Sequence, residues 1–349
     1  MARASRALCA EVPTMELRLR PLKEQVIVIT GASSGIGLVT AKRAAASGAR
    51  IVLAARNEAE LAAAVREIRE HGGRAIYHVT DVADARQVED LGEAAVAEFG
   101  AVDSWINNAG VSVYGRCTDT PLADLRRQFD VNYWGQVHGM LTAVQLLRTR
   151  GGALINVASA TADSAIPFQG NYCASKHAIA AFTNTLRVEL EEAGLPISVT
   201  LVKPGSMDTP LFEKARSFLG VEPGPIPPVY APDVAARAIL TATERSLREI
   251  TAGMSRVANE HKMFDSQRTA IPIRDDRADN LYEPVMHDGG ERGHFEGRVR
   301  ERSIYTQAVL HPKRTALFGT AAATAAVVAA RRAFVHRKTA ADVSDTRAD

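Results

Sequence analysis

The sequence predicts an α/β fold in which a parallel sheet of about seven strands is covered by helices on both faces. Short, β-branched apolar runs alternate with helix-length segments from residue 25 to about residue 252. The first run, QVIVIT, leads directly into a glycine-rich turn, which is typical of a buried strand followed by a helix. Strands that alternate with helices form parallel sheets, because each crossover helix packs back onto the sheet.

The predicted strands and helices follow one another along the chain. The strands are residues 25–30, 50–55, 75–79, 104–107, 153–157, 197–202 and 249–251. The helices are residues 36–47, 58–71, 83–99, 122–149, 172–193 and 232–243. Ligands of such sheets bind beyond the carboxyl ends of the strands, so we expect the functional residues in the turns that follow the strands.

We expect one domain at residues 21–253, flanked by segments of different composition. Residues 1–20 hold only a short apolar stretch, too weak for a secretory signal, so we expect them outside the fold, with Met15 as an alternative start. Residues 254–311 are densely charged and poor in apolar side chains, which predicts an irregular or partly disordered extension. Residues 312–349 are expected to form an Ala-rich helix with basic flanks and a polar tail.

The segment 315–330 (TALFGTAAATAAVVAA) carries no charge and is bracketed by basic pairs. It is shorter than the roughly 20 mostly apolar residues of a spanning helix. Two interpretations stay open. The segment is a helix that docks on the domain or on a partner, or it makes a weak membrane contact with snorkelling basic flanks.

Composition excludes several classes of function. The 349 residues have a net charge of +2, which gives no electrostatic footprint for nucleic acid. The three cysteines, Cys9, Cys117 and Cys173, form no CxxC pair, which predicts neither disulfides nor a zinc site and fits a reducing, cytoplasmic compartment. No metal is expected, because the histidines show no ligand pair with supporting acids, and His177 is expected on a helix surface.

Glycines in the turn after the first strand point to a phosphate-binding site. The turn reads TGASSGIG, from Thr30 to Gly37. Glycines permit a tight turn and let backbone N–H groups approach a pyrophosphate at a helix N-terminus, where the helix dipole favours an anion. A glycine cluster alone is often only a turn. Between a β-branched strand and a helix, in the first of several such units, it predicts a dinucleotide site.

The end of the second strand bears on which dinucleotide is bound. Folds that bind NAD usually place an acid here for the ribose 2′-hydroxyl, whereas this chain has Ala55 followed by Arg56. Arg56 can bind a 2′-phosphate through bidentate hydrogen bonds, which favours NADP(H) over NAD(H), although a solvated arginine at a helix start has the same pattern. Asp81, at the end of the third strand, either reaches the adenine or caps the next helix.

Tyr172 and Lys176 form the candidate reactive pair. Their spacing of four puts them on one face of a helix, a pattern that is also common on exposed faces. An ammonium group beside a tyrosine favours the phenolate and lowers the tyrosine pKa toward the range useful for acid–base chemistry. Ser159, at the end of the fifth strand, can stabilise charge that develops on a substrate carbonyl oxygen. Asn132 either positions a water in a proton path from Lys176 or is a satisfied buried amide that distorts its helix.

With these motifs in place, the chain resembles the short-chain dehydrogenase/reductase family, in the branch with subunits of roughly 250 residues. The cofactor turn, Thr-Gly-x-x-x-Gly-x-Gly, stands at Thr30 to Gly37, and the Asn-Asn-Ala-Gly motif at Asn107 to Gly110. The catalytic asparagine, serine, tyrosine and lysine match Asn132, Ser159, Tyr172 and Lys176. A Pro-Gly pair follows the sixth strand. The match covers about residues 22–252 and says nothing of the rest.

The resemblance implies a doubly wound Rossmann-type sheet and an oxidoreductase that transfers a hydride between NADP(H) and an alcohol or carbonyl substrate. Tyr172 would be the general acid and base, Lys176 would lower its pKa and hold the nicotinamide ribose, Ser159 would orient the carbonyl, and Asn132 would maintain the proton relay. The expected cofactor contacts are Thr30, Gly31, Ser33, Ser34, Gly35, Ile36, Gly37, Arg56, Asp81, Val82, Asn108, Ala109, Gly110, Tyr172, Lys176, Pro204, Gly205 and Thr209. A homo-oligomer is expected on the same ground.

The substrate itself is less well defined. The loop after the sixth strand, residues 206–230, carries Met207, Leu211, Phe212, Phe218 and Leu219, which favours a hydrophobic or medium-sized substrate. Two other classes of function stay open. One is an NADP-binding sensor or scaffold without turnover. The other is a membrane-tethered assembly protein whose extension is the functional part.

Overall fold

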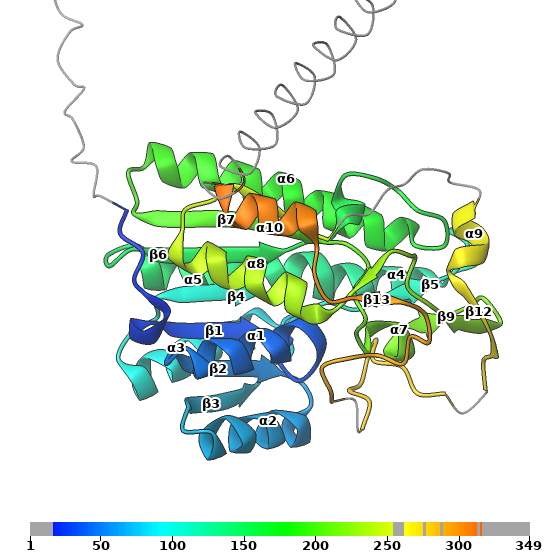
Figure 1. Cartoon of the computed structure of the whole chain (residues 1–349), viewed down its shortest axis with the longest axis horizontal. Helices are drawn as coiled ribbons and strands as arrows, with labels where there is room; N and C mark the ends of the chain where they lie inside the picture. Colours follow the sequence, from blue (N-terminus) through cyan, green and yellow to red (C-terminus); the bar gives the residue numbers. More distant parts are fainter. Residues whose placement is uncertain (1–16, 254–261, 275–276, 287–288, 313–314, 316–349) are drawn as a thin grey trace, which may run out of the picture. The chain divides into compact units, whose positions relative to one another are not determined.

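The central feature of the computed structural model is a seven-stranded, wholly parallel sheet (Figure 1). The structure describes residues 17–253, 262–274, 277–286, 289–312 and 315. The sheet has the order β11-β7-β6-β4-β1-β2-β3. Its strands are β1 (Val26–Thr30), β2 (Arg50–Ala55), β3 (Arg74–Val79), β4 (Ser104–Asn107), β6 (Gly152–Val157), β7 (Ile197–Pro204) and β11 (Glu249–Ala252). The predicted doubly wound fold is confirmed.

The strand order reverses between β1 and β4. The chain winds outward from β1 to β2 and β3 on one side, and from β4 to β6, β7 and β11 on the other. Every residue of β1, β4, β6 and β7 is buried, so these strands are covered on both faces, as their uninterrupted apolar runs predict. A crevice opens at such a reversal, because the connections leave the two central strands in opposite directions.

Helices cover both faces of the sheet. The longer ones are α1 (Gly35–Ala46), α2 (Glu58–Glu70), α3 (Ala85–Phe99), α5 (Gly135–Leu147), α6 (Gly170–Glu192) and α8 (Pro232–Glu244). On one face α1 packs between α2 and α8; on the other α3 packs against α5 (Figure 1). The start of α3 is capped by Asp84, whose side chain accepts from the N–H groups of Arg86 and Gln87.

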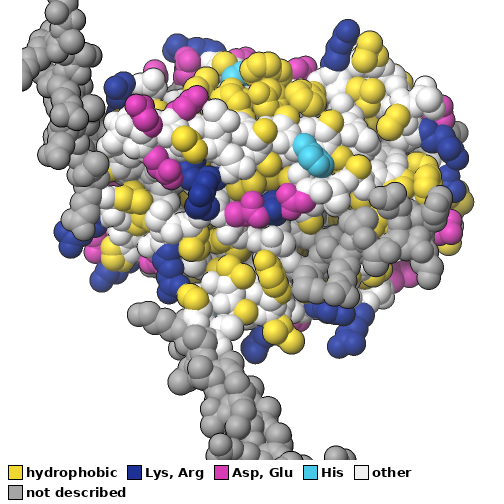
Figure 2. All heavy atoms as spheres, turned by 90° about the horizontal axis from the view of Figure 1, so that it is seen from above, with side chains coloured by type: hydrophobic (Ala, Val, Ile, Leu, Met, Phe, Trp, Pro, Cys, Tyr) yellow, Lys and Arg dark blue, Asp and Glu magenta, His cyan; other side chains and the backbone are white. Residues whose placement is uncertain are grey.

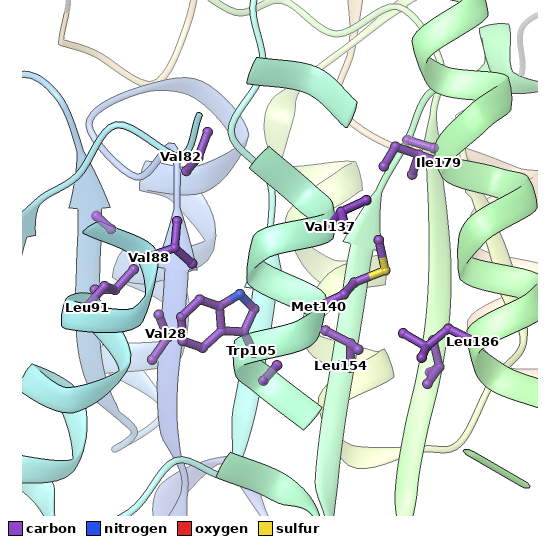
Figure 3. Close-up of a cluster of buried hydrophobic side chains, with 14 of the residues drawn as sticks. Val28, Val82, Val88, Leu91, Trp105, Val137, Met140, Leu154, Ile179 and Leu186 are labelled. Carbon is purple, nitrogen blue, oxygen red and sulfur yellow. The ribbon is translucent and has the colours of Figure 1, made fainter. Parts of the chain in front are cut away.

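Trp105, on β4, lies at the centre of the larger buried cluster. Its ring sits between Val88 and Leu91 of α3 and Met140 of α5 (Figure 3). Its indole N–H donates to Oδ1 of Asn107, 2.8 Å away, and the Asn107 amide donates to Asn156 at 2.9 Å. A buried polar chain therefore crosses from β4 to β6 inside an otherwise apolar layer.

The long helix predicted at residues 122–149 is interrupted. It consists of α4 (Leu122–Phe129), a π-helical segment (Asp130–Trp134) and α5. A π-helical turn inserts one extra residue and rotates the side chains that follow it, and such turns are frequent at functional sites. Apolar periodicity alone cannot reveal it, because the sequence remains helical on either side.

Residues beyond 253 are folded onto the domain more closely than their composition predicts. The described residues up to Thr306 belong to one compact unit. Here β12 (Arg268–Pro272) pairs antiparallel with β9 (Val221–Pro223), and β13 (Val299–Arg300) pairs with β10 (Val229–Tyr230). The extension thus adds strands to the loop that follows β7. The remaining short elements are β5 (Val113–Tyr114), β8 (Arg216–Ser217), α7 (Leu211–Lys214), α9 (Lys262–Ser266), α10 (Ile304–Leu310) and two 3-10 helices (Leu22–Glu24 and Ala160–Ala162).

The surface agrees with the balanced composition. The face in Figure 2 carries basic and acidic side chains dispersed among hydrophobic and uncharged ones. None of the described helices is both long and apolar enough to cross a membrane. The predicted Ala-rich segment at 315–330 falls, apart from residue 315, outside the described residues.

Gly139 of α5 provides a test of how tightly the central layer is packed. A methyl group on Gly139 would lie 1.9 Å from Oδ1 of Asn107, which is fixed by its bonds to Trp105 and Asn156. We expect Gly139→Ala to destabilise the protein by about 1–3 kcal/mol, the usual cost of overpacking, measured as a lower urea midpoint. Leu141→Ala, on the exposed side of the same helix, is the control and should cost less than about 0.5 kcal/mol. Equal effects would contradict this packing.

Candidate active site

The hydroxyl of Thr30 links the two turns that border the crevice between β1 and β4. Its Oγ1 accepts hydrogen bonds from the backbone N–H of Asn108 at 3.0 Å and of Ala109 at 3.1 Å. The side-chain amide of Asn108 in turn donates to the carbonyls of Thr30 and Gly31. The turn after β1 and the turn after β4 are therefore fixed to each other.

The backbone of the glycine turn has angles and close contacts that only glycine allows. Gly31 and Gly35 have φ angles of 65° and 54°, which other residues rarely adopt. A Cβ on Gly37 would lie 2.2 Å from the carbonyl oxygen of Gly31. The backbone thus stays close to α1, whose N-terminal N–H groups and dipole favour an anion.

A cavity of about 260 Å³ runs along this edge of the sheet. Most of the predicted site residues line it, namely Gly31, Ser33, Ser34, Gly35, Ile36, Arg56, Asp81, Val82, Asn108, Ala109, Gly110, Ser159, Tyr172, Lys176, Pro204, Gly205 and Thr209. Thr30, Gly37 and Asn132 do not line it and instead support residues of its wall. Sites predicted from separate turns of the chain therefore meet in one cavity.

Tyr172 lies in the first turn of α6, next to Ser159 from the end of β6. Burial raises the pKa of Tyr172 to about 12, and a hydrogen bond with Ser159 offsets part of this effect. The hydroxyl of Ser159 also accepts from the N–H of Thr161 at 3.1 Å, which fixes its position. Tyr172 is therefore protonated at neutral pH and has a polar neighbour at its hydroxyl.

Lys176 is one helical turn further along α6, with Nζ 5.5 Å from the centre of the Tyr172 ring. Nζ donates to the carbonyl of Val157 at 3.1 Å, and burial lowers the pKa of Lys176 to about 8. The effect of Lys176 on the pKa of Tyr172 stays a prediction.

Asn132 lies within the π-helical segment and is fully buried. Its Oδ1 accepts from the N–H of Val111 at 2.8 Å, while its amide donates to the Val111 carbonyl and to Ser175. The amide is thus satisfied within a distorted helix, and its role in a proton path from Lys176 stays a prediction. A Cβ on Gly110 would lie 3.4 Å from Oδ1 of Asn132 and 3.8 Å from Nζ of Lys176, so both groups face the same side of Gly110.

Asp81 does not cap the next helix, because Asp84 does so. One carboxylate oxygen of Asp81 accepts from the N–H of Ala83, and the other pairs with Arg127 of α4 at 2.5 Å. Arg127 also donates to the carbonyl of Leu281 at 3.1 Å. Asp81 thus remains at the cavity as a paired carboxylate.

The sequence analysis missed the contribution of the extension. Asn280 and Pro284 line the cavity, and Arg56 donates hydrogen bonds to the backbone carbonyls of Asn280, Leu281 and Tyr282. Arg56 therefore lines the cavity and at the same time binds the extension through hydrogen bonds. The charged composition of residues 277–293 concealed this, because charge runs usually indicate solvated chain.

Two further groups of side chains complete the cavity. Apolar residues line one part, namely Ile166, Met207, Leu211, Phe212, Ile226 and Met263, and polar ones line another, namely Ser112, Tyr114 and Gln169. Of the loop residues expected to form an apolar lid, Met207, Leu211 and Phe212 do line the cavity. Phe218 is instead exposed, and Leu219 packs against a small separate cluster.

Comparison with known proteins gives a consistent result. The family model described as short chain dehydrogenase matches residues 25–220. The uncharacterized oxidoreductase YxnA of Bacillus subtilis is 41% identical over 317 residues, covering 85% of this chain and 88% of that protein. This match extends beyond residue 253.

Two solved structures are similar in fold. An alcohol dehydrogenase from the archaeon Thermococcus sibiricus, complexed with 5-hydroxy-NADP, has a TM-score of 0.57 and 25% identity, covering 67% of this chain and 99% of that one. A single-substitution variant of the actinorhodin polyketide ketoreductase, with NADPH, has a TM-score of 0.52 and 31% identity, covering 55% and 74% of the two chains.

Burial of Lys176 predicts a pH-dependent stability effect. Its pKa falls from 10.5 to about 8 on folding, so its charged form opposes folding below pH 8, and this penalty disappears as pH rises from 8 to 10.5. We expect Lys176→Met to raise the melting temperature at pH 7 and to raise it much less at pH 10. The Val157 carbonyl keeps a donor in the variant, because Gln136 also donates to it. An equal gain at both pH values would contradict the shifted pKa.

Proposed function

The chain belongs to the short-chain dehydrogenase family of oxidoreductases, and we propose that it transfers a hydride between NADP(H) and an alcohol or carbonyl substrate, with Tyr172 as general acid and base. The observation that carries the proposal is that a single cavity is lined both by Tyr172, Ser159 and Lys176 and by the glycine turn. Separate segments of the chain supply these groups, so their convergence is a property of the fold.

The side chains are suited to carbonyl reduction. A bound reduced nicotinamide would supply the hydride to the carbonyl carbon. Ser159 donates to the carbonyl oxygen and holds it near Tyr172, whose hydroxyl, with a pKa of about 12, carries the proton that this oxygen takes up. In the reverse direction Tyr172 accepts the proton from the alcohol, and the ammonium group of Lys176 stabilises the phenolate. Lys176 also holds the nicotinamide ribose.

NADP(H) is proposed over NAD(H) on two grounds. The residue at the end of β2 is Ala55, without an acid to accept from a ribose 2′-hydroxyl, and Arg56 follows it. The two similar solved structures contain NADPH and 5-hydroxy-NADP. The glycine turn and the N-terminus of α1 fit the pyrophosphate of either dinucleotide.

For the substrate we propose a hydrophobic or medium-sized alcohol or carbonyl compound. Its apolar part would contact Met207, Leu211 and Phe212, which line the cavity. A cytoplasmic location, from the use of cysteine, and a homo-oligomeric state, from the family resemblance, remain proposals. The competing proposal is an NADP-binding sensor without turnover; it is less favoured because all four catalytic positions are intact. A panel of ketones, aldehydes, steroids and sugars, scored by NADPH consumption, distinguishes the two.

Tyr172→Phe tests the acid–base role. Removing the hydroxyl while keeping the ring should lower kcat by at least about 100-fold, because general acids contribute roughly 10²–10⁴-fold. NADPH affinity, measured by fluorescence titration, should change little and serves as the internal control. A variant that keeps more than about a hundredth of the wild-type rate would rule Tyr172 out as the proton donor.

Arg56→Asp tests the choice of dinucleotide. Aspartate would repel a 2′-phosphate and can accept from the free 2′-hydroxyl of NADH. We expect the KM for NADPH to rise at least about tenfold, equivalent to roughly 1.4 kcal/mol, with little change or a gain for NADH. Both cofactors are compared with one substrate at fixed ionic strength, because exposed charge contacts are screened by salt. Equal losses would mean that Arg56 acts only through the fold.

A further inference from the structure

Two stretches of the extension, residues 277–286 and 289–293, lie against the turns that carry Arg56 and the start of α1. We call these two stretches the strap. Arg56 Nη1 donates to the carbonyl of Tyr282 at 2.6 Å and to that of Leu281 at 3.5 Å, and Nη2 donates to the carbonyl of Asn280. Asn57, the cap of α2, donates to the carbonyl of Val285 at 3.0 Å.

The second attachment is at the N-terminus of α1. The N–H of Gly35 donates to the carbonyl of Gly290 at 2.8 Å, and Ser34 and Gly290 form a parallel β-bridge. Gly35 is the first residue of α1, so this N–H belongs to the group of helix-terminal donors that favour an anion. An N–H group has a single hydrogen and cannot serve both the Gly290 carbonyl and a phosphate at full strength.

The strap is anchored independently of these donors. Leu281 is fully buried in the large hydrophobic cluster. Asp279 pairs with Arg216 at 2.8 Å, the hydroxyl of Tyr282 donates to Asp124 at 2.9 Å, and the N–H of Asn280 donates to the carbonyl of Lys214 at 3.0 Å. The contacts of Arg56 with the strap are therefore part of a folded arrangement.

At the adenosine end of the cavity the strap presents acceptors. The three strap carbonyls that bind Arg56 are acceptors. Oδ1 of Asn280 is a buried acceptor with no hydrogen-bond partner among the described residues. Asn280 also lines the cavity. An acceptor-rich wall suits a hydroxyl, which can donate, and opposes a phosphate, whose oxygens only accept at neutral pH.

We propose that residues 280–282 determine cofactor selectivity by competing with the 2′-phosphate of NADP(H) for Arg56, an inference that rests on the proposed function. The docked strap excludes a 2′-phosphate from Arg56, so NADP(H) binds with these carbonyls released. A phosphate can displace them, because its pairing with the guanidinium adds the attraction of opposite charges to two parallel hydrogen bonds, whereas the carbonyls are neutral. NAD(H) has no 2′-phosphate and does not require this release.

The strap therefore reduces the preference for NADP(H) below the value that Arg56 alone would give. The apparent affinity for a ligand falls by the fraction of molecules in the competent state. Weakening the anchors of the strap increases that fraction without altering Arg56 or the glycine turn. The ratio of the two dissociation constants, for NADPH and for NADH, is the quantity that must change.

The test uses the full chain with the double substitution Asp279→Asn and Tyr282→Phe, which removes the charge that pairs with Arg216 and the hydroxyl that donates to Asp124. We expect the Kd for NADPH to fall about three- to tenfold, as for the loss of one or two surface contacts, and the Kd for NADH to change less than about twofold. Tyr305→Phe, at an exposed tyrosine of the extension outside the strap, is the matched control and should alter neither constant. Circular dichroism checks that the variants are folded.

Hydrogen exchange on the wild type provides a second measurement that needs no variant. NADPH should increase the exchange of the Asn280 N–H, which the docked strap protects through Lys214, whereas NADH should not. The proposal would be overturned by weaker NADPH binding of the double variant, by an unchanged ratio of the two Kd values, or by protection of the strap by NADPH. The first and the last of these results would make the strap part of the binding site. A wild type that binds neither dinucleotide would refute the proposed function instead, and this inference with it.

Discussion

The hydroxyl of Thr30 is the contact on which the rest of the site depends. Parallel strands β1 and β4 are adjacent in the sheet, but their connections leave in opposite directions, and the ladder of sheet hydrogen bonds between them ends with the strands. Thr30 links the two turns beyond that point by accepting from the N–H groups of both Asn108 and Ala109. These bonds fix the distance between the glycine turn and Gly110. Gly110 in turn lies beside Lys176.

Burial gives the reactive pair its character and also has a cost in stability. Burial raises the pKa of Tyr172 to about 12 and lowers that of Lys176 to about 8. A lysine in this environment is still mostly charged at neutral pH. The fold tolerates that charge because the Val157 carbonyl accepts from it. The charge of the buried Lys176 therefore lowers the stability of the fold at the place where acid–base chemistry is proposed.

The sequence predicts much of this arrangement because local patterns carry it. The apolar runs at Val26–Thr30 and Ile197–Pro204 are typical of buried strands, and the glycines at 31, 35 and 37 are each required by backbone geometry. A distortion of the helix at Asn132 is among the sequence interpretations, but its π-helical form is not, because the sequence is typical of a helix on either side. The strap is also invisible, because its contacts to Arg56 are made by backbone carbonyls, which have no sequence signature.

The pairing of β9 with β12 decides whether the catalytic domain is an autonomous unit. A chain shortened at residue 253 would leave the backbone of β9 without its partner strand and would remove Leu281 from the hydrophobic cluster. Unpaired strand edges and vacated apolar surface both promote aggregation. Removing the extension would therefore destabilise the rest of the domain. Insertions and fusions are better tolerated at the exposed turn of Gly72, where a Cβ would meet no other atom within 4 Å.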